Sequence, residues 1–231
     1  MNYDQPAENR VTSHYEYTTN EVIPIDVGQV KTSAFQFMDK LDGWCSHQKA
    51  SILIDLILKF KPKTVLEIGV WGGRSLVPMA CALKANTQGI IYGIDPWDSL
   101  ASIEEAQNES NKDWWSKVDH NAVLQKLIGR IDEFKLVDQI KLLKTTSEKA
   151  DPILNIDILH VDGNHSDKTS YFDVQKWVPM VNKGGFIIFD DMTWTENGIN
   201  TTARAVEWLD ENCIKIGEYQ DNCLWGIWQK S

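Results

Sequence analysis

The feature that most constrains the fold is a regular alternation of short apolar segments with helical segments, from about residue 64 onward. Each apolar segment has strand-like composition and ends near glycine or an acidic residue, while the following stretch has helical spacing. We expect strands at 65–69, 90–95, 140–145, 156–162 and 186–190. Because alternating strands and helices form right-handed crossovers, this order predicts a parallel sheet with helices on both faces.

Between these strands, helices are expected from Ser75, as a short segment after 145, and over 167–181 and 200–211. The end of the chain departs from the alternation, with two successive strands near 214–219 and 223–228. Asp221 and Asn222 between the last two strands permit a hairpin. The predicted fold is therefore α/β: a Rossmann-like, doubly wound, mostly parallel sheet of seven strands with an antiparallel C-terminal hairpin.

Two regions lie outside this plan. Residues 1–32 are polar and suggest an extended arm, followed by helices near 33–41 and 46–60, the second capped by Ser46 and stopped by Pro62. We assign 1–60 to an arm with cap helices and 61–231 to the main domain. About 44 residues separate Asp95 from Ile140, more than one crossover helix needs. The insertion near 97–138 is either a substrate lid or an extra helical hairpin.

Composition excludes several classes of protein. The formal charge of −10 disfavours nucleic-acid binding, which depends on surplus Lys and Arg. The N-terminal residues do not resemble a secretion signal, and the most apolar stretch, 51–60, is too short to span a membrane. The four cysteines lack zinc-site or disulfide-framework spacing, so a reducing, cytoplasmic location is expected. Both a monomer and a homo-oligomer remain open.

Glycines follow the first expected strand. Gly69, Gly72 and Gly73 come directly after Glu67 and permit a sharp turn against which a ligand can lie. Trp71 occupies the position where a dinucleotide fingerprint needs a second glycine, so a pyrophosphate is disfavoured. The loop suits a smaller, uncharged or cationic group, or it is a tight turn without a ligand.

Asp95 ends the second expected strand. Its carboxylate can accept hydrogen bonds from both hydroxyls of a ribose, or it can simply open the turn before Pro96. With the glycine loop, it suggests an adenosyl ligand without a diphosphate, because such ligands bind beyond the carboxyl ends of the strands.

Three acids close the fourth and fifth expected strands. If these strands are neighbours, about 5 Å apart, Asp162, Asp190 and Asp191 meet at one corner of the crevice. Repulsion would raise the pKa of at least one of them unless a cation binds, and oxygen ligands suit Mg²⁺ or a similar divalent ion. The alternative is that each acid caps the following turn.

His165 lies three residues after Asp162 in the same loop. A histidine there can remove a proton from a metal-bound hydroxyl near neutral pH. A solvated loop histidine is the alternative. His160, within an apolar strand, is interpreted as a core residue.

Tryptophan is abundant, with ten residues in 231. Five of them fall in expected loops or in the insertion, where aromatic rings could face a ligand. These five are Trp71, Trp97, Trp114, Trp115 and Trp194.

The chain resembles the class I S-adenosylmethionine-dependent methyltransferases, and within them the metal-dependent O-methyltransferases, over about residues 60–228. Residues 65–80, VLEIGVWGGRSLVPMA, are similar to the first cofactor motif of catechol O-methyltransferase. Residues 160–166, HVDGNHS, and 184–191, GGFIIFDD, are similar to motifs of sugar O-methyltransferases of antibiotic biosynthesis. His165 matches a histidine of some sugar enzymes, where the catechol enzymes have lysine, and Asp191 replaces their usual asparagine.

The resemblance implies a role for each of these residues. The main domain would bind S-adenosylmethionine, with Ser75 near its carboxylate, Asp95 at the ribose and Ser147 near the adenine. The methionine part of S-adenosylmethionine would lie along the glycine loop, and Trp97 would also contact the cofactor. Asp162, Asp190 and Asp191 would hold the ion, and His165 would be the base. The loop residues are Glu67, Gly69, Gly72 and Gly73.

The expected activity is methyl transfer to a hydroxyl of a small polyhydroxylated molecule, with a sugar or sugar-bearing natural product favoured. A catechol-like aromatic acceptor is one alternative. A non-catalytic sensor of S-adenosylmethionine is another, and a nicotinamide oxidoreductase is disfavoured by Trp71.

Overall fold

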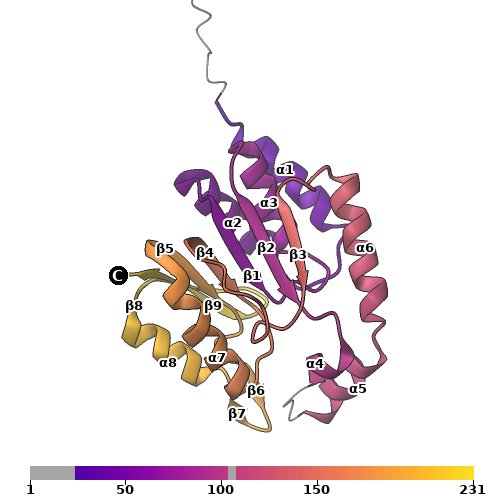
Figure 1. The fold of residues 1–231 in the computed structure, drawn as a ribbon, viewed down its shortest axis with the longest axis vertical. Helices are drawn as coiled ribbons and strands as arrows, with labels where there is room; N and C mark the ends of the chain where they lie inside the picture. The colour runs from indigo at the N-terminus through magenta and orange to yellow at the C-terminus, as the bar shows by residue number, and fades with distance from the viewer. Residues whose placement is uncertain (1–23, 104–107) are drawn as a thin grey trace, which may run out of the picture.

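The computed structural model describes residues 24–103 and 108–231 (Figure 1). Seven strands form one sheet in the order β3-β2-β1-β4-β5-β9-β8. The pairs among β1 to β5 are parallel, whereas β9 pairs antiparallel with both β5 and β8. The predicted α/β fold and the hairpin are confirmed. The strands are β1 Thr64–Ile68, β2 Ile90–Asp95, β3 Ile140–Lys144, β4 Ile156–Val161, β5 Val181–Phe189, β8 Cys213–Gln220 and β9 Leu224–Lys230.

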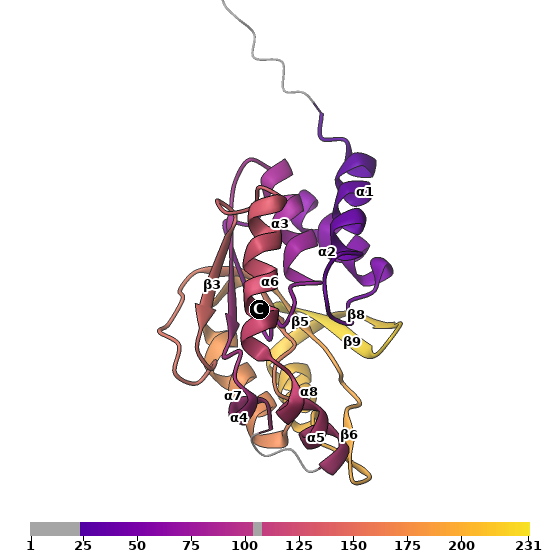
Figure 2. The ribbon, with the colours of Figure 1, turned by 90° about the vertical axis from the view of Figure 1, so that its right-hand side faces the viewer.

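Helices cover both faces of the sheet because successive strand residues point to opposite sides. Val65 joins a cluster with the helices α1, α2, α3 and α6, whereas Leu66 joins one with α7 and α8. Figure 2 shows α1 and α2 beside α3, so the N-terminal helices share the core of the main domain. The helices are α1 Val27–Met38, α2 His47–Phe60, α3 Leu76–Ala85, α6 His120–Glu133, α7 Asp167–Trp177, followed by the 3-10 turn Val178–Met180, and α8 Ala203–Asn212.

The first helix begins earlier than predicted. Asp26 caps α1 by accepting a hydrogen bond from the Gln29 N–H at 3.0 Å, so the predicted start near residue 33 is wrong. The rest of the expected arm, residues 1–23, lies outside the described residues. The second helix is confirmed, since Ser46 accepts from the Lys49 N–H at 2.9 Å and the helix ends before Pro62.

The insertion contains the crossover helix as well as extra structure. α6 presents Leu124, Leu127 and Ile131 to the core, so it is the crossover between β2 and β3. The additional elements are the short helices α4, Ser99–Ile103, and α5, Glu109–Lys117. Figure 1 shows them beyond the carboxyl ends of β2 and β3.

The short helix expected after residue 145 is absent from the described chain, and a single turn takes its place. The Lys149 and Ala150 N–H groups donate to the Thr146 carbonyl at 3.1 and 3.0 Å. Pro152 follows at once and lacks the N–H that a longer helix would need. A separate two-stranded ribbon consists of β6, Thr195–Glu196, and β7, Ile199–Asn200.

Among the described helices, none combines the length and the apolar character required to cross a bilayer. All four cysteines are free thiols.

Candidate active site

A cavity of about 590 Å³ lies at the carboxyl ends of the parallel strands. Its walls include Gly69 and Val70 after β1, and Asp162 and Gly163 after β4. The strand order reverses between β1 and β4, and a sheet of this kind binds ligands at that reversal. The volume is that of a small-molecule site.

Gly69 allows the loops after β1 and β4 to approach each other closely. Its φ is +85°, and a Cβ at this position would lie 1.9 Å from the Asp162 carbonyl oxygen. A side chain would therefore force the two loops apart. Gly69 lines the cavity.

Gly72 and Gly73 are necessary for packing on the other side of the loop. A Cβ at Gly72 would lie 2.4 Å from the Asp42 carbonyl oxygen, and one at Gly73 would lie 2.5 Å from Leu127 Cδ1. Both glycines are absent from the cavity wall of the described chain. They fix the loop against the α1–α2 connection and α6.

Asp95 fastens the glycine loop to the end of β2. Its carboxylate accepts hydrogen bonds from the backbone N–H groups of Val70 at 3.0 Å, Trp71 at 2.9 Å and Trp97 at 2.7 Å. Burial raises its pKa above the ordinary value, against the effect of these donors. Asp95 lines the cavity, whereas Trp97 is buried and donates its indole N–H to the Trp71 carbonyl at 2.9 Å.

Glu67 lies beneath the cavity instead of at its mouth. The fully buried carboxylate accepts from the Ser75 hydroxyl at 2.5 Å, and His160 Nδ1 lies 2.9 Å from the same oxygen. Ser75 is at the N-cap of α3, but its hydroxyl bonds to Glu67 and not to the helix. Of these three residues, only Ser75 belongs to the cavity wall.

Lys49 of α2 extends this buried network to the end of β5. Its ammonium contacts the Asp190 carboxylate and lies 3.1 Å from His160 Nε2. Burial opposes ionisation of Asp190, but the charges of Lys49 and His160 hold its pKa well below the usual range. Lys49 was not predicted as a site residue, although Lys49, Leu53 and Ile57 share the spacing of one helix face.

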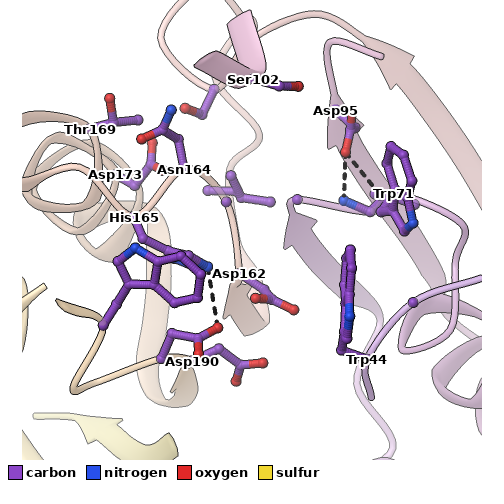
Figure 3. A pocket seen from close by; sticks show the side chains of 18 of the residues that line it. Trp44, Trp71, Asp95, Ser102, Asp162, Asn164, His165, Thr169, Asp173 and Asp190 are labelled. Carbon is purple, nitrogen blue, oxygen red and sulfur yellow. Dashed lines mark hydrogen bonds and ion pairs between the residues drawn. The ribbon is translucent and has the colours of Figure 1, made fainter. Parts of the chain in front are cut away.

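Asp162, His165 and Asp191 meet at one corner of the cavity. Figure 3 shows Asp162 and His165 at this corner. One ligand atom from each lies within 4.8 Å of the others, and His165 Nε2 is 3.2 Å from Asp191 Oδ2. Burial and the neighbouring Asp190 raise the pKa of Asp162 well above its ordinary value. The carboxylates of Asp162 and Asp191 lie close enough to hold a divalent cation, with the His165 imidazole beside them. Asp190, the third predicted ligand, contacts Lys49.

Aromatic rings flank the cavity. Trp71, Trp114, Trp115 and Trp194 line it, as does Trp44, which the sequence analysis missed. Trp44 and Trp71 stack at 6.2 Å between ring centroids, and Figure 3 shows them across the cavity from His165. The ring of His165 lies 4.8 Å from that of Trp194.

The tip of the C-terminal hairpin completes the wall beside Trp44. Asp221, Asn222 and Cys223 line the cavity. The Asn222 side-chain amide donates to the Trp44 carbonyl at 2.7 Å, and the Ser46 hydroxyl donates to the Asp221 carboxylate.

Ser147 lines the cavity in the turn after β3. Nearby on α7, Asp173 is buried and also belongs to the wall. Its position was missed because an acidic residue in a helix is ordinarily solvated, and the sequence gives no sign of its burial.

Comparison with known proteins agrees with this geometry. A family model described as a methyltransferase domain matches residues 66–192. An uncharacterized protein of Sinorhizobium fredii is 22% identical over 172 residues, which are 73% of this chain. The matched region is only 17% of that protein's length.

Two solved structures share the fold. The O-methyltransferase of Bacillus cereus, in complex with S-adenosylhomocysteine, has a TM-score of 0.60 at 14% identity, covering 93% of this chain and 96% of that one. The O-methyltransferase TomG of Streptomyces achromogenes, involved in tomaymycin synthesis and in complex with S-adenosylmethionine, has a TM-score of 0.60 at 15% identity, covering 93% and 94%. Since the family model matches more than half of the chain, the protein belongs to this methyltransferase-domain family, with the fold of the class I S-adenosylmethionine-dependent enzymes.

Proposed function

We propose that the protein transfers a methyl group from S-adenosylmethionine to a hydroxyl oxygen of a small polyhydroxylated molecule, with a sugar or sugar-bearing natural product favoured. One observation carries the proposal. The glycine loop after β1 and the corner of Asp162, His165 and Asp191 open into the same cavity. A donor beside the loop and an acceptor at the corner would therefore meet.

The methyl donor would bind at one end of the cavity. Four predicted cofactor contacts line it, namely Gly69, Ser75, Asp95 and Ser147. Asp95 Oδ1 accepts one hydrogen bond from the protein and keeps capacity for a ribose hydroxyl. Ser75 is bonded to Glu67, which orients its hydroxyl at the start of α3. The Bacillus and Streptomyces structures, with their adenosyl ligands, support the same use of this fold.

The acceptor hydroxyl would bind at the corner formed by Asp162, His165 and Asp191. Asp162 and Asp191 would hold a divalent ion such as Mg²⁺, with Asp190 behind them in contact with Lys49. When bound, such an ion lowers the pKa of a hydroxyl that it contacts. The His165 imidazole would accept the hydroxyl proton, and Asp191, whose Oδ2 lies 3.2 Å from Nε2, would stabilise the imidazolium that results.

The transfer is a direct displacement. The acceptor oxygen forms a bond to the methyl carbon while the carbon–sulfur bond breaks, and its electron pair stays on sulfur as a thioether. The chain contributes by holding the reacting atoms in line and by taking up the proton. Trp44 and Trp194 would cover the apolar faces of a sugar ring.

The tryptophans also favour a second acceptor class. Rings spaced 4.7 to 6.3 Å apart among Trp44, Trp71, Trp114 and Trp115 suit a flat, catechol-like molecule as well as a sugar. Two adjacent phenolic oxygens would meet the same corner. The activity test therefore needs both classes.

The test combines binding with turnover. Calorimetry should detect S-adenosylmethionine binding, electron paramagnetic resonance should detect Mn²⁺ binding, and labelled donor should mark sugar or catechol acceptors. Asp162→Ala should abolish Mn²⁺ binding and metal-stimulated turnover. The control is Asp167→Ala, an exposed carboxylate paired with Arg204 outside the cavity. Unchanged Mn²⁺ binding by Asp162→Ala, or full turnover in metal-free buffer, would reject the role of the ion.

A further inference from the structure

Asp173 is a buried carboxyl group without a hydrogen bond. Its side chain lies on α7 and is 1% exposed. Neither of its oxygens has a hydrogen-bond partner among the described residues. Burial raises its pKa to about 7, against the lowering effects of the nearby Ser147 hydroxyl and Lys176. A buried group of this kind is destabilising unless something pairs with it.

No described residue forms a hydrogen bond of normal geometry with the Asp173 carboxyl group, but the cavity gives a ligand access to it. Lys176, one turn along the helix, instead donates to the backbone carbonyls of Ser147, Glu148 and Ala150 at 2.7 to 2.9 Å. Asp173 forms part of the cavity wall. An unpaired carboxyl group on that wall points to a ligand that supplies hydrogen-bond donors.

The position of Asp173 in the cavity indicates which part of the ligand would contact it. Ser147, after β3, and Gly163, after β4, lie beside it; a Cβ at Gly163 would be 3.4 Å from Asp173 Oδ2. Figure 3 shows Asp173 with Asn164 and Thr169 on the side of the cavity opposite Trp44 and Trp71. Asp173 therefore lies across the cavity from the stacked rings of Trp44 and Trp71.

The hydrogen-bonding capacity of the carboxyl group limits which ligand groups can pair with Asp173. A carboxylate accepts two hydrogen bonds, and a carboxylic acid accepts one and donates one. The edge of an adenine ring presents an amino donor beside a ring-nitrogen acceptor. A carboxylic acid pairs with both groups, and a carboxylate pairs with the amino group alone. Phe172 lines the same cavity and offers an aromatic surface to such a ring.

We propose that Asp173 binds the 6-amino group of the adenine ring of the methyl donor and so selects adenosyl ligands. This inference rests on the proposed function, because it takes S-adenosylmethionine to be the donor. Asp173 is a specificity residue and takes no part in the chemical step.

A double-mutant cycle between the protein and the ligand tests it. Dissociation constants are measured by calorimetry for S-adenosylhomocysteine and for its analogue without the 6-amino group. The wild-type protein should bind the analogue about 10- to 100-fold more weakly, the range expected for a lost hydrogen bond to a carboxyl group. Asp173→Leu should bind the two ligands alike, with a ratio near one.

Two further variants complete the design. Asp173→Asn keeps an acceptor and a donor and should retain most of the preference, whereas Asp167→Leu, on the same helix but outside the cavity, should leave both constants unchanged. Equal binding of the two ligands by the wild type, or an unchanged ratio in Asp173→Leu, would overturn the inference alone. If the wild type bound neither ligand, the proposed function itself would fail.

Discussion

The ammonium of Lys49 contacts the carboxylate of Asp190, and these side chains are only 3% and 4% exposed. The pair connects α2, near the start of the described chain, to the residue that follows β5. His160 Nε2 lies 3.1 Å from the ammonium and 3.4 Å from Asp190 Oδ1, so the imidazole is close to both members of the pair. The acidic corner thus has an internal positive charge behind it.

Removal of the Lys49 charge should lower the stability of the folded protein. Lys49→Met would leave Asp190 buried without its cation, and breaking a buried pair in this way lowers the free energy of unfolding by about 3–5 kcal/mol. Urea denaturation followed by circular dichroism measures the change. Lys31→Met is the control, because Lys31 pairs with the half-exposed Asp55 and should cost less than about 1 kcal/mol. Similar losses in both variants would contradict a special role for the buried pair.

Alanine at Gly69 should damage the cavity, whereas alanine at Gly129 should not. Gly69→Ala would meet the Asp162 carbonyl and strain a φ of +85°, so we expect loss of S-adenosylhomocysteine binding together with lower stability. Gly129, on α6, has open space around the added methyl group, and alanine there should raise stability by about 0.4–1 kcal/mol. Thermal unfolding with and without ligand distinguishes the two. Normal binding by Gly69→Ala would show that the close approach of the loops is dispensable.

The buried carboxyl of Asp173 should make stability depend on pH. Its pKa in the folded protein is about 7, above the value of 3.8 for a free side chain, so the folded state holds the proton more tightly. The wild type should therefore lose stability as pH rises from about 4 to 7, by roughly 2–4 kcal/mol in total. Asp173→Asn removes this titration and should be the more stable protein at pH 8. Denaturation at pH 5 and pH 8 checks the sign; an identical pH dependence in both proteins would exclude it.

His165 should affect turnover and leave donor binding unchanged. Replacement by Asn removes the proposed proton acceptor, and the loss of a general base typically lowers kcat by about 10²- to 10⁴-fold. The dissociation constant of S-adenosylmethionine should stay the same. His47→Asn is the matched control, since His47 is exposed and bonded to Asp39. Unaltered kcat in His165→Asn, with an active acceptor, would reassign the base.

Much of the fold could be predicted because strand and helix periodicities are local signals. The parallel strands, the Ser46 cap and the hairpin at Asp221 are properties of short segments, and the structure contains them. The first helix was placed too late because Asp26 was not recognised as its cap. The turn at Thr146 replaced an expected helix because Pro152 limits its length.

The site residues were harder to predict from the sequence, because contacts between distant segments determine which side chains reach the cavity. Gly69, Asp95 and the acidic residues were expected at strand ends, and they line the cavity. Glu67 sits at the same kind of position, yet its carboxylate bonds to Ser75 and His160 below the cavity floor. The involvement of Lys49 depends on the docking of α2, which no local pattern specifies.

The contacts of Ser46 with Asp221 and of Trp44 with Asn222 have a consequence for biosynthesis. More than 170 residues separate the members of each pair, so a nascent chain has already exposed Trp44 long before its partner leaves the ribosome. The cavity wall can be completed only after translation has reached the last hairpin. Premature termination before Asp221 would leave the cavity wall beside Trp44 incomplete.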